Sequence, residues 1–161
     1  VVVQHMPPGF TKHFADSLNL EGRLEVTEAK SGDRVMPGRV LIAPGGEHMT
    51  VRRSGGVYIV QCNKGENVNG HCPSVDVLFD SVARVAAGNA VGIILTGMGA
   101  DGAEGLLKMR LSGARTIGQD EATSIVYGMP KVADDLGAVE EVQPLEGISG
   151  AIVRCLGGVW P

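Results

Sequence analysis

Two side chains that hydrolases use as a pair, a histidine and a carboxylate, each follow an apolar segment of this sequence. His5 comes soon after Val1-Val2-Val3, and Asp101 lies in a glycine-rich segment after the apolar run 90–95. A histidine base oriented by a carboxylate is the pair that activates a hydroxyl nucleophile. A histidine at the end of a strand is also commonly structural, and an aspartate before a glycine commonly forms a turn. The residue types alone leave both interpretations open.

The segments before these two residues are predicted to be buried strands. Val1-Val2-Val3 is β-branched and is broken by Pro7-Pro8-Gly9, while the run 90–95 leads through glycines into a helix expected from about 103 to 112. In an open parallel sheet, the ligand crevice lies beyond the carboxyl ends of the strands. We therefore expect His5 and Asp101 to face one crevice.

The rest of the chain alternates between helical and extended patterns. Helices are expected over 10–18, after an N-cap at Ser74, over 129–137 and over 145–156. Strands are expected over 35–43, over 50–61 with a hairpin turn at 54–56, over 114–119 and over 139–142. This order predicts an α/β fold with a doubly wound, mainly parallel sheet, helices on both faces and an inserted antiparallel hairpin. We expect a single domain spanning residues 1–161.

The composition narrows the classes of partner. The 161 residues suit one domain, and the 24 glycines are about twice the usual share, as expected for a fold with many tight turns. A formal charge of -4 without a basic block argues against nucleic acid as a partner. No apolar run is long enough for membrane insertion. Three cysteines without a Cys-x-x-Cys pair suggest neither disulfides nor zinc, so a cytoplasmic protein is expected.

Two other chemistries fit parts of the sequence. The segment 97–102 satisfies G-x-G-x-x-G after a strand, with Asp120 suitably placed for a ribose contact, which would indicate dinucleotide binding. However, Asp101 would then put negative charge beside the pyrophosphate. The histidines and cysteines are types that ligate metals, but no two histidines have the i, i+4 spacing of a helical zinc motif. We expect no cofactor and no metal.

Five segments, taken together and in order, resemble the motifs of CheB-type chemotaxis methylesterase domains. They are Gln4-His5-Met6-Pro7-Pro8-Gly9-Phe10, Ile42-Ala43-Pro44-Gly45 with His48-Met49, Pro73-Ser74-Val75-Asp76-Val77-Leu78-Phe79, Leu95-Thr96-Gly97-Met98-Gly99-Ala100-Asp101-Gly102-Ala103 and Tyr127-Gly128-Met129-Pro130. They cover nearly the whole chain, and five matches in order are far more specific than any one of them.

The resemblance implies a catalytic role for three positions. The family is a doubly wound α/β hydrolase with a Ser-His-Asp triad, which demethylates glutamates of methyl-accepting chemotaxis receptors and, in many members, deamidates glutamines. Its histidine would be His5, its aspartate Asp101, and an oxyanion-hole N–H that of Met98. His5 would transfer the proton, Asp101 would hold the imidazole tautomer, and the Met98 amide would stabilise the developing negative charge.

The sequence departs from the family pattern at two places. The family's nucleophilic serine lies after the first strand of the domain, upstream of the histidine, and none of the serines present replaces it. We therefore expect the first strand and nucleophile turn to be missing, with low solubility and no activity for this chain alone. The alternative is a non-catalytic relic of the domain that only binds receptors. The second departure is Cys72, which stands where the family usually has arginine; it is either a lost substrate contact or an ordinary loop residue.

The family also implies a regulatory partner. Members commonly carry an N-terminal receiver domain whose phosphorylation relieves inhibition of the esterase. The resemblance therefore makes such a domain a further expected partner of this chain.

Overall fold

The computed structural model describes residues 1–157 and forms two compact units, one from Val1 to Ser81 and the other from Val82 onward. The first unit contains α1 (Phe10–Glu21), β1 (Glu25–Glu28), β2 (Arg39–Ile42), β3 (His48–Ser54), β4 (Val57–Asn63) and most of α2 (Val75–Ala86). The second contains the end of α2, a short 3-10 helix (Ala87–Asn89), β5 (Val91–Ile94), α3 (Ala103–Leu111), β6 (Arg115–Gln119), α4 (Met129–Asp135), β7 (Glu141–Gln143) and α5 (Leu145–Cys155).

A small parallel sheet and helix α1 form one part of the first unit. β1 pairs with β2 in parallel, and Val2 makes a parallel bridge to Ile42 of β2. Ala15 of α1 packs with Val26 and Ile42, so one face of the helix covers these strands. The sequence prediction missed β1, and the strand expected over 35–43 is confined to Arg39–Ile42.

The segment before His5 differs in burial from the prediction. Val1 and Val2 were expected inside a sheet, yet these two residues are 40% and 38% exposed. Among the residues described, Val2 bridges only to Ile42. The extended conformation of this segment was predicted correctly. The prediction that Val1 and Val2 are buried is wrong.

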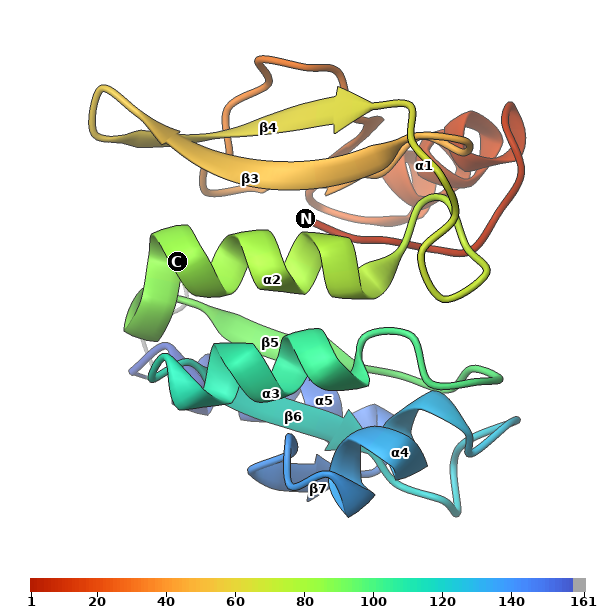
Figure 1. Ribbon diagram of the computed structural model, residues 1–161, viewed down its shortest axis with the longest axis vertical. Helices are drawn as coiled ribbons and strands as arrows, with labels where there is room; N and C mark the ends of the chain where they lie inside the picture. Colours follow the sequence, from red (N-terminus) through yellow and green to blue (C-terminus); the bar gives the residue numbers. More distant parts are fainter. Residues whose placement is uncertain (158–161) are drawn as a thin grey trace. The chain divides into compact units, whose positions relative to one another are not determined.

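Strands β3 and β4 form the antiparallel hairpin that the sequence predicted (Figure 1). Ser54 pairs with Val57, and both turn glycines have positive φ, 54° for Gly55 and 86° for Gly56. A two-residue turn with this backbone suits the twist of a hairpin. The backbone N–H of Val51 donates to the Ser81 hydroxyl at 2.8 Å, which attaches the hairpin to α2.

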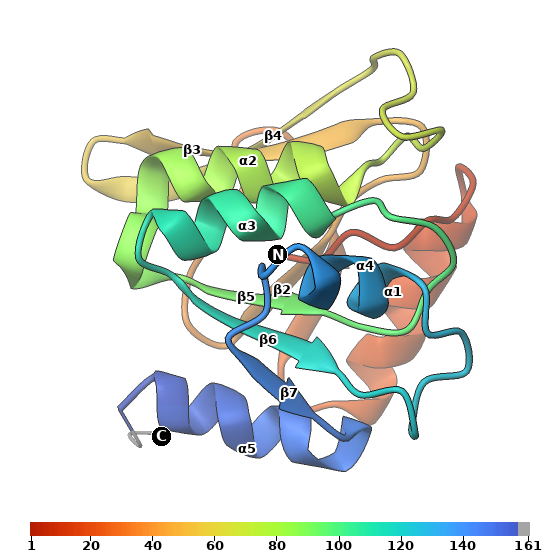
Figure 2. The ribbon, with the colours of Figure 1, turned by 60° about the horizontal axis from the view of Figure 1, so that its bottom comes forward.

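The second unit is a parallel three-stranded sheet in the order β5-β6-β7. A Cβ on Gly92 would meet Leu106 and Met109, so α3 covers that face of β5. Ile117 of β6 packs with Ile148 and Ala151 of α5. Figure 2 shows α3 and α4 on one side of these strands and α5 on the other. The predicted α/β class, with parallel strands, helices on both faces and an inserted hairpin, is confirmed.

No helix within residues 1–157 is both long and apolar enough to cross a bilayer.

Candidate active site

His5 lies in the segment that follows the Val2–Ile42 bridge and runs close to Gly45. A Cβ on Gly45 would stand 2.5 Å from the backbone carbon of Pro7 and from the nitrogen of Pro8. Only glycine permits this approach of two backbones. The Gly45 N–H also donates to the Thr11 hydroxyl at 3.0 Å, so the start of α1 holds the same turn.

The His5 ring stacks face to face on the ring of His71. The ring centroids are 3.7 Å apart and the planes differ by 5°. His71 was not among the predicted site residues. A sequence signal was available, because Asn69-Gly70 before it is a strong predictor of a tight hairpin turn.

The other two histidines of the chain have different surroundings. The Nδ1 atom of His48 accepts from the Ser74 backbone N–H at 3.2 Å, and its Nε2 lies 2.8 Å from the carbonyl oxygen of Glu66. With both ring nitrogens engaged by backbone groups, His48 has a structural role. His13 is exposed on α1. Within residues 1–157, no three His, Cys, Asp or Glu side chains are grouped closely enough to hold a metal ion.

Asp101 lies in the loop of the second unit between β5 and α3. Its side chain is buried, with 1% exposed. Gly99 and Gly102 on either side have φ of 93° and 94°, a region that glycine adopts without strain. The N–H of Ala103 donates to the carbonyl of Ala100 at 3.1 Å, which closes the turn around the aspartate. A carboxylate is costly to bury unless polar groups surround it, so this position suits a residue with a specific task.

The same loop carries Met98, and hydrogen bonds hold its base. The N–H of Gly97 donates to Val126 O at 3.1 Å, and the N–H of Met129 donates to Gly97 O at 2.8 Å. Met98 as a whole residue is 82% exposed. No intramolecular acceptor is found for the Met98 N–H in the described part of the chain. The hydrogen bonds of the neighbouring Gly97 hold the loop next to Met98.

The residue proposed for ribose binding in a dinucleotide site has a local role. The Asp120 carboxylate accepts from the backbone N–H of Thr123 at 3.0 Å and from its hydroxyl at 2.6 Å. Both bonds stay within one turn. Together with the buried Asp101 in the glycine loop, this arrangement disfavours the dinucleotide interpretation.

Several serine hydroxyls are engaged by the backbone. Those of Ser31, Ser81, Ser112 and Ser124 donate to the carbonyls of Cys62, Leu78, Met109 and Asp120, at distances from 2.6 to 3.0 Å. Ser74, expected as a helix cap, directly precedes α2 and is fully buried. These surroundings are those of structural serines.

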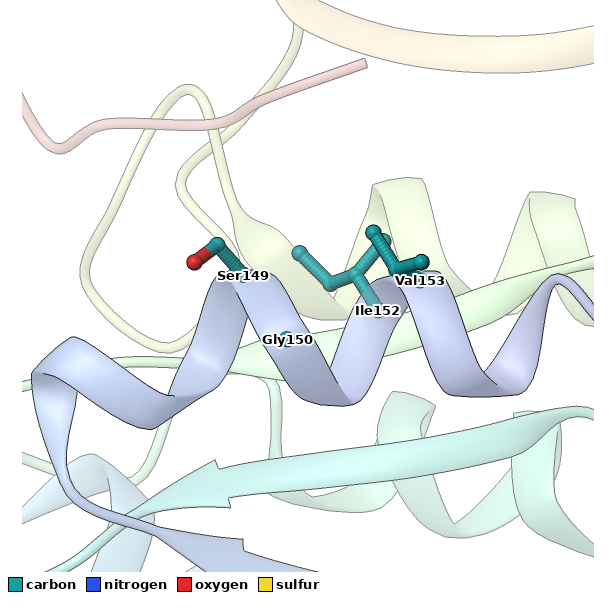
Figure 3. Close-up of a pocket in the computed structure, with 4 residues that line it drawn as sticks. All are labelled: Ser149, Gly150, Ile152 and Val153. Atoms are coloured by element: carbon teal, nitrogen blue, oxygen red, sulfur yellow. The ribbon is translucent and has the colours of Figure 1, made fainter. Parts of the chain in front are cut away.

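A hollow of about 360 Å³ lies along α5 (Figure 3). Ser149, Gly150, Ile152 and Val153 line it. Because α5 covers the face of the second unit's sheet opposite α3, this hollow is away from the loop that carries Asp101. We assign it no part in the chemistry.

The predicted site residues thus occupy two structural settings. Asp101 and Met98 share one loop of the second unit, and His5 lies in the first unit. His5 follows the parallel bridge of Val2, and the loop with Met98 and Asp101 follows the parallel strand β5. Both parallel segments were predicted from the sequence.

The comparisons with known proteins agree on one family. The family described as CheB methylesterase matches residues 1–152. A protein-glutamate methylesterase/protein-glutamine glutaminase of Syntrophomonas wolfei is 60% identical over 156 residues, and one of Pseudomonas aeruginosa is 54% identical over 154. The crystal structure of the Thermotoga maritima CheB methylesterase catalytic domain superposes with a TM-score of 0.92 at 38% identity, covering 95% of this chain and 81% of that one.

The matched regions cover nearly all of this chain but less than half of each relative. They cover 97% and 96% of this chain, but only 46% of the S. wolfei protein and 44% of the P. aeruginosa protein. The chain therefore spans less than half the length of these curated relatives.

Proposed function

The chain belongs to the CheB methylesterase family, and from this premise we propose that it contributes the histidine, the aspartate and an oxyanion-hole amide to a serine esterase. The proposed substrates are methyl esters of glutamate side chains on chemotaxis receptors. The proposed nucleophile is a serine upstream of Val1. The main support is the glycine loop after β5, which combines the buried Asp101 with Met98, beside the hydrogen-bonded Gly97.

The proposed reaction begins with a proton transfer to His5. His5 takes the proton of the serine hydroxyl while the serine oxygen attacks the ester carbonyl, and Asp101 stabilises the imidazolium that forms. The Met98 N–H donates to the negative oxygen of the tetrahedral intermediate. As the bond to the methoxy oxygen breaks, His5 returns the proton, and methanol leaves.

The second half repeats the first with water as the nucleophile. His5 takes a proton from water, which attacks the acyl-serine ester. Collapse of the second tetrahedral intermediate returns that proton to the serine and releases the glutamate carboxylate. With a glutamine side chain as the substrate, the first leaving group is ammonia instead of methanol, so deamidation needs no further residue.

The proposal includes a cellular setting. The receptor substrates require a cytoplasmic enzyme, and the greater length of the relatives leaves room for a regulatory receiver domain. Neither the cytoplasmic location nor a receiver domain changes the roles of His5, Asp101 and Met98.

The proposal is tested by methanol release from methylated receptor, using a protein that contains this chain and the segment preceding it. We expect His5→Ala to reduce turnover by about 10⁴-fold or more, because the base is lost. The control is His13→Ala, since His13 is exposed on α1. The 161-residue chain alone should release no methanol. Release by that chain, or an active His5→Ala protein, would contradict the proposal.

A non-catalytic receptor-binding module is the alternative. The test separates the two, because such a module would bind methylated receptor in a pull-down but release no methanol in the longer form. Full turnover in the longer form excludes it.

A further inference from the structure

His71, whose ring stacks on the ring of His5, has no role in the proposed mechanism. At 3.7 Å between centroids and 5° between planes, the two rings are in contact over their faces. Stacking uses the face of the His5 ring, whereas its nitrogens form hydrogen bonds at the ring edge in the same plane. A neighbour in this position limits rotation of the ring and does not compete for either nitrogen.

A tight turn delivers His71 to this position. Val68 and His71 exchange two backbone hydrogen bonds, each 3.0 Å long. The two residues between them, Asn69 and Gly70, have positive φ of 53° and 82°. This is the backbone of a two-residue hairpin turn, for which Asn-Gly is the preferred sequence. His71 is therefore held at the end of a defined turn.

Two further contacts tie the turn to its surroundings in the first unit. The Asn69 side-chain amide donates to the Asp76 carboxylate, in the first turn of α2, at 2.6 Å. The carbonyl of Cys72, next to His71, accepts from the Gly46 N–H at 3.1 Å. Gly46 adjoins Gly45, against which the backbone after His5 packs. The two rings thus belong to one connected framework.

We infer that His71 is a positioning residue: by stacking on His5, it fixes the plane of the imidazole in which the proposed base must transfer protons. The inference rests on the proposed function, since it gives His5 its catalytic role. Proton transfer requires the ring edge to stay aligned with its partners through both halves of the reaction. A ring free to rotate would spend less time in the productive orientation, which lowers kcat more than KM.

The first test compares substitutions of His71 in the protein that contains the segment preceding this chain. We expect His71→Ala to lower kcat by about 10- to 100-fold, within the range known for small displacements of catalytic groups, with KM little changed. His71→Phe keeps a flat ring that can stack and should recover most of the activity. Asn69→Ala, which removes the bond to Asp76, should shift kcat in the same direction by a smaller factor. His13→Ala is the matched control.

The outcomes separate stacking from other roles. Wild-type kcat in His71→Ala would overturn the inference, and so would a His71→Phe protein as slow as His71→Ala, because the imidazole would then act through its nitrogens. If His5→Ala itself retained activity, the proposed function would fail instead. Loss in His5→Ala with no effect of His71→Ala would leave the proposed function intact and remove the inference alone.

A spectroscopic readout tests the stack without turnover. The measurement is an NMR spectrum of protein with ¹³C-labelled histidine. The stacked His71 ring shields the ring protons of His5, so His71→Ala should move the His5 ring signals downfield. His71→Phe should keep them shielded, and the thermal midpoint of both variants should stay near that of the wild type. An unchanged His5 signal in His71→Ala would overturn the inference.

Discussion

At the scale of single residues, burial sets the behaviour of Cys62. Removal from water raises the pKa of the Cys62 thiol from 9.0 to about 11, and the negative charges of Glu47, Asp33 and Glu28 act in the same direction. The thiolate is the reactive form of cysteine. Cys62 therefore stays a neutral thiol near pH 7 and reacts slowly with alkylating reagents while the protein is folded.

The raised pKa of Cys62 also predicts a pH dependence of stability. The unfolded chain releases this proton near pH 9, whereas the folded chain keeps it until about pH 11. The contribution to the free energy of unfolding is therefore complete below pH 9 and is lost as the pH rises to 11. The free energy of unfolding in urea should decrease from about pH 8 to about pH 10.5, and the decrease should be smaller for Cys62→Ala than for the wild type. Equal decreases would show that Cys62 is not responsible.

At the scale of the elements, the close approach at Gly45 makes a prediction about stability. In Gly45→Ala the new methyl group would lie 2.5 Å from the Pro7 backbone. The segment after His5 must move, at a cost of about 1–3 kcal/mol in the free energy of unfolding. The control is Gly150→Ala, whose new methyl lies 3.6 Å from Arg154 within α5 and should stabilise that helix. A thermal midpoint of Gly45→Ala equal to or higher than that of Gly150→Ala would contradict the prediction.

A second glycine supports the loop that carries Met98. A Cβ on Gly128 would lie 2.6 Å from the carbonyl oxygen of Gly97 and 3.2 Å from the Cα of Met98. Both atoms belong to the backbone, so Gly128→Ala should displace the loop. If the Met98 amide stabilises the oxyanion, kcat should fall by up to about 10²–10³-fold.

Kinetics of methanol release by the longer protein measure this effect of Gly128→Ala. Gly150→Ala again serves as the control for a glycine substitution outside the loop. A Gly128→Ala protein with unchanged kcat would remove the Met98 loop from the oxyanion hole.

The elements also show what the sequence could and could not predict. The apolar run before Thr96 and the hairpin at Gly55-Gly56 were predicted because each has a strong local pattern. Strand β1 was missed because Glu25–Glu28 is short and has a carboxylate at each end, so its pairing with β2 depends on tertiary contacts. The turn at Asn69-Gly70 could have been predicted from the sequence, but the stack of His71 on His5 could not, because contact between residues distant in sequence leaves no periodicity.

At the scale of the whole molecule, α2 is the covalent connection between the two units. Its residues up to Ser81 belong to the first unit, and those from Val82 belong to the second. In the proposed mechanism, the histidine comes from the first unit and the aspartate from the second.

The proposed triad, in which Asp101 orients His5, makes a prediction about additivity. Alone, Asp101→Asn should cost up to about 10⁴ in kcat, because an amide favours the wrong imidazole tautomer. Residues that act as one catalytic unit are strongly non-additive, since removing the base leaves the carboxylate nothing to orient. The double variant His5→Ala/Asp101→Asn should therefore be no slower than His5→Ala alone. Single-turnover rates of methanol release from methylated receptor, with all proteins at equal folded concentration, measure this difference. If the two losses multiplied, His5 and Asp101 would act independently, and the assignment of both residues to one triad would be wrong.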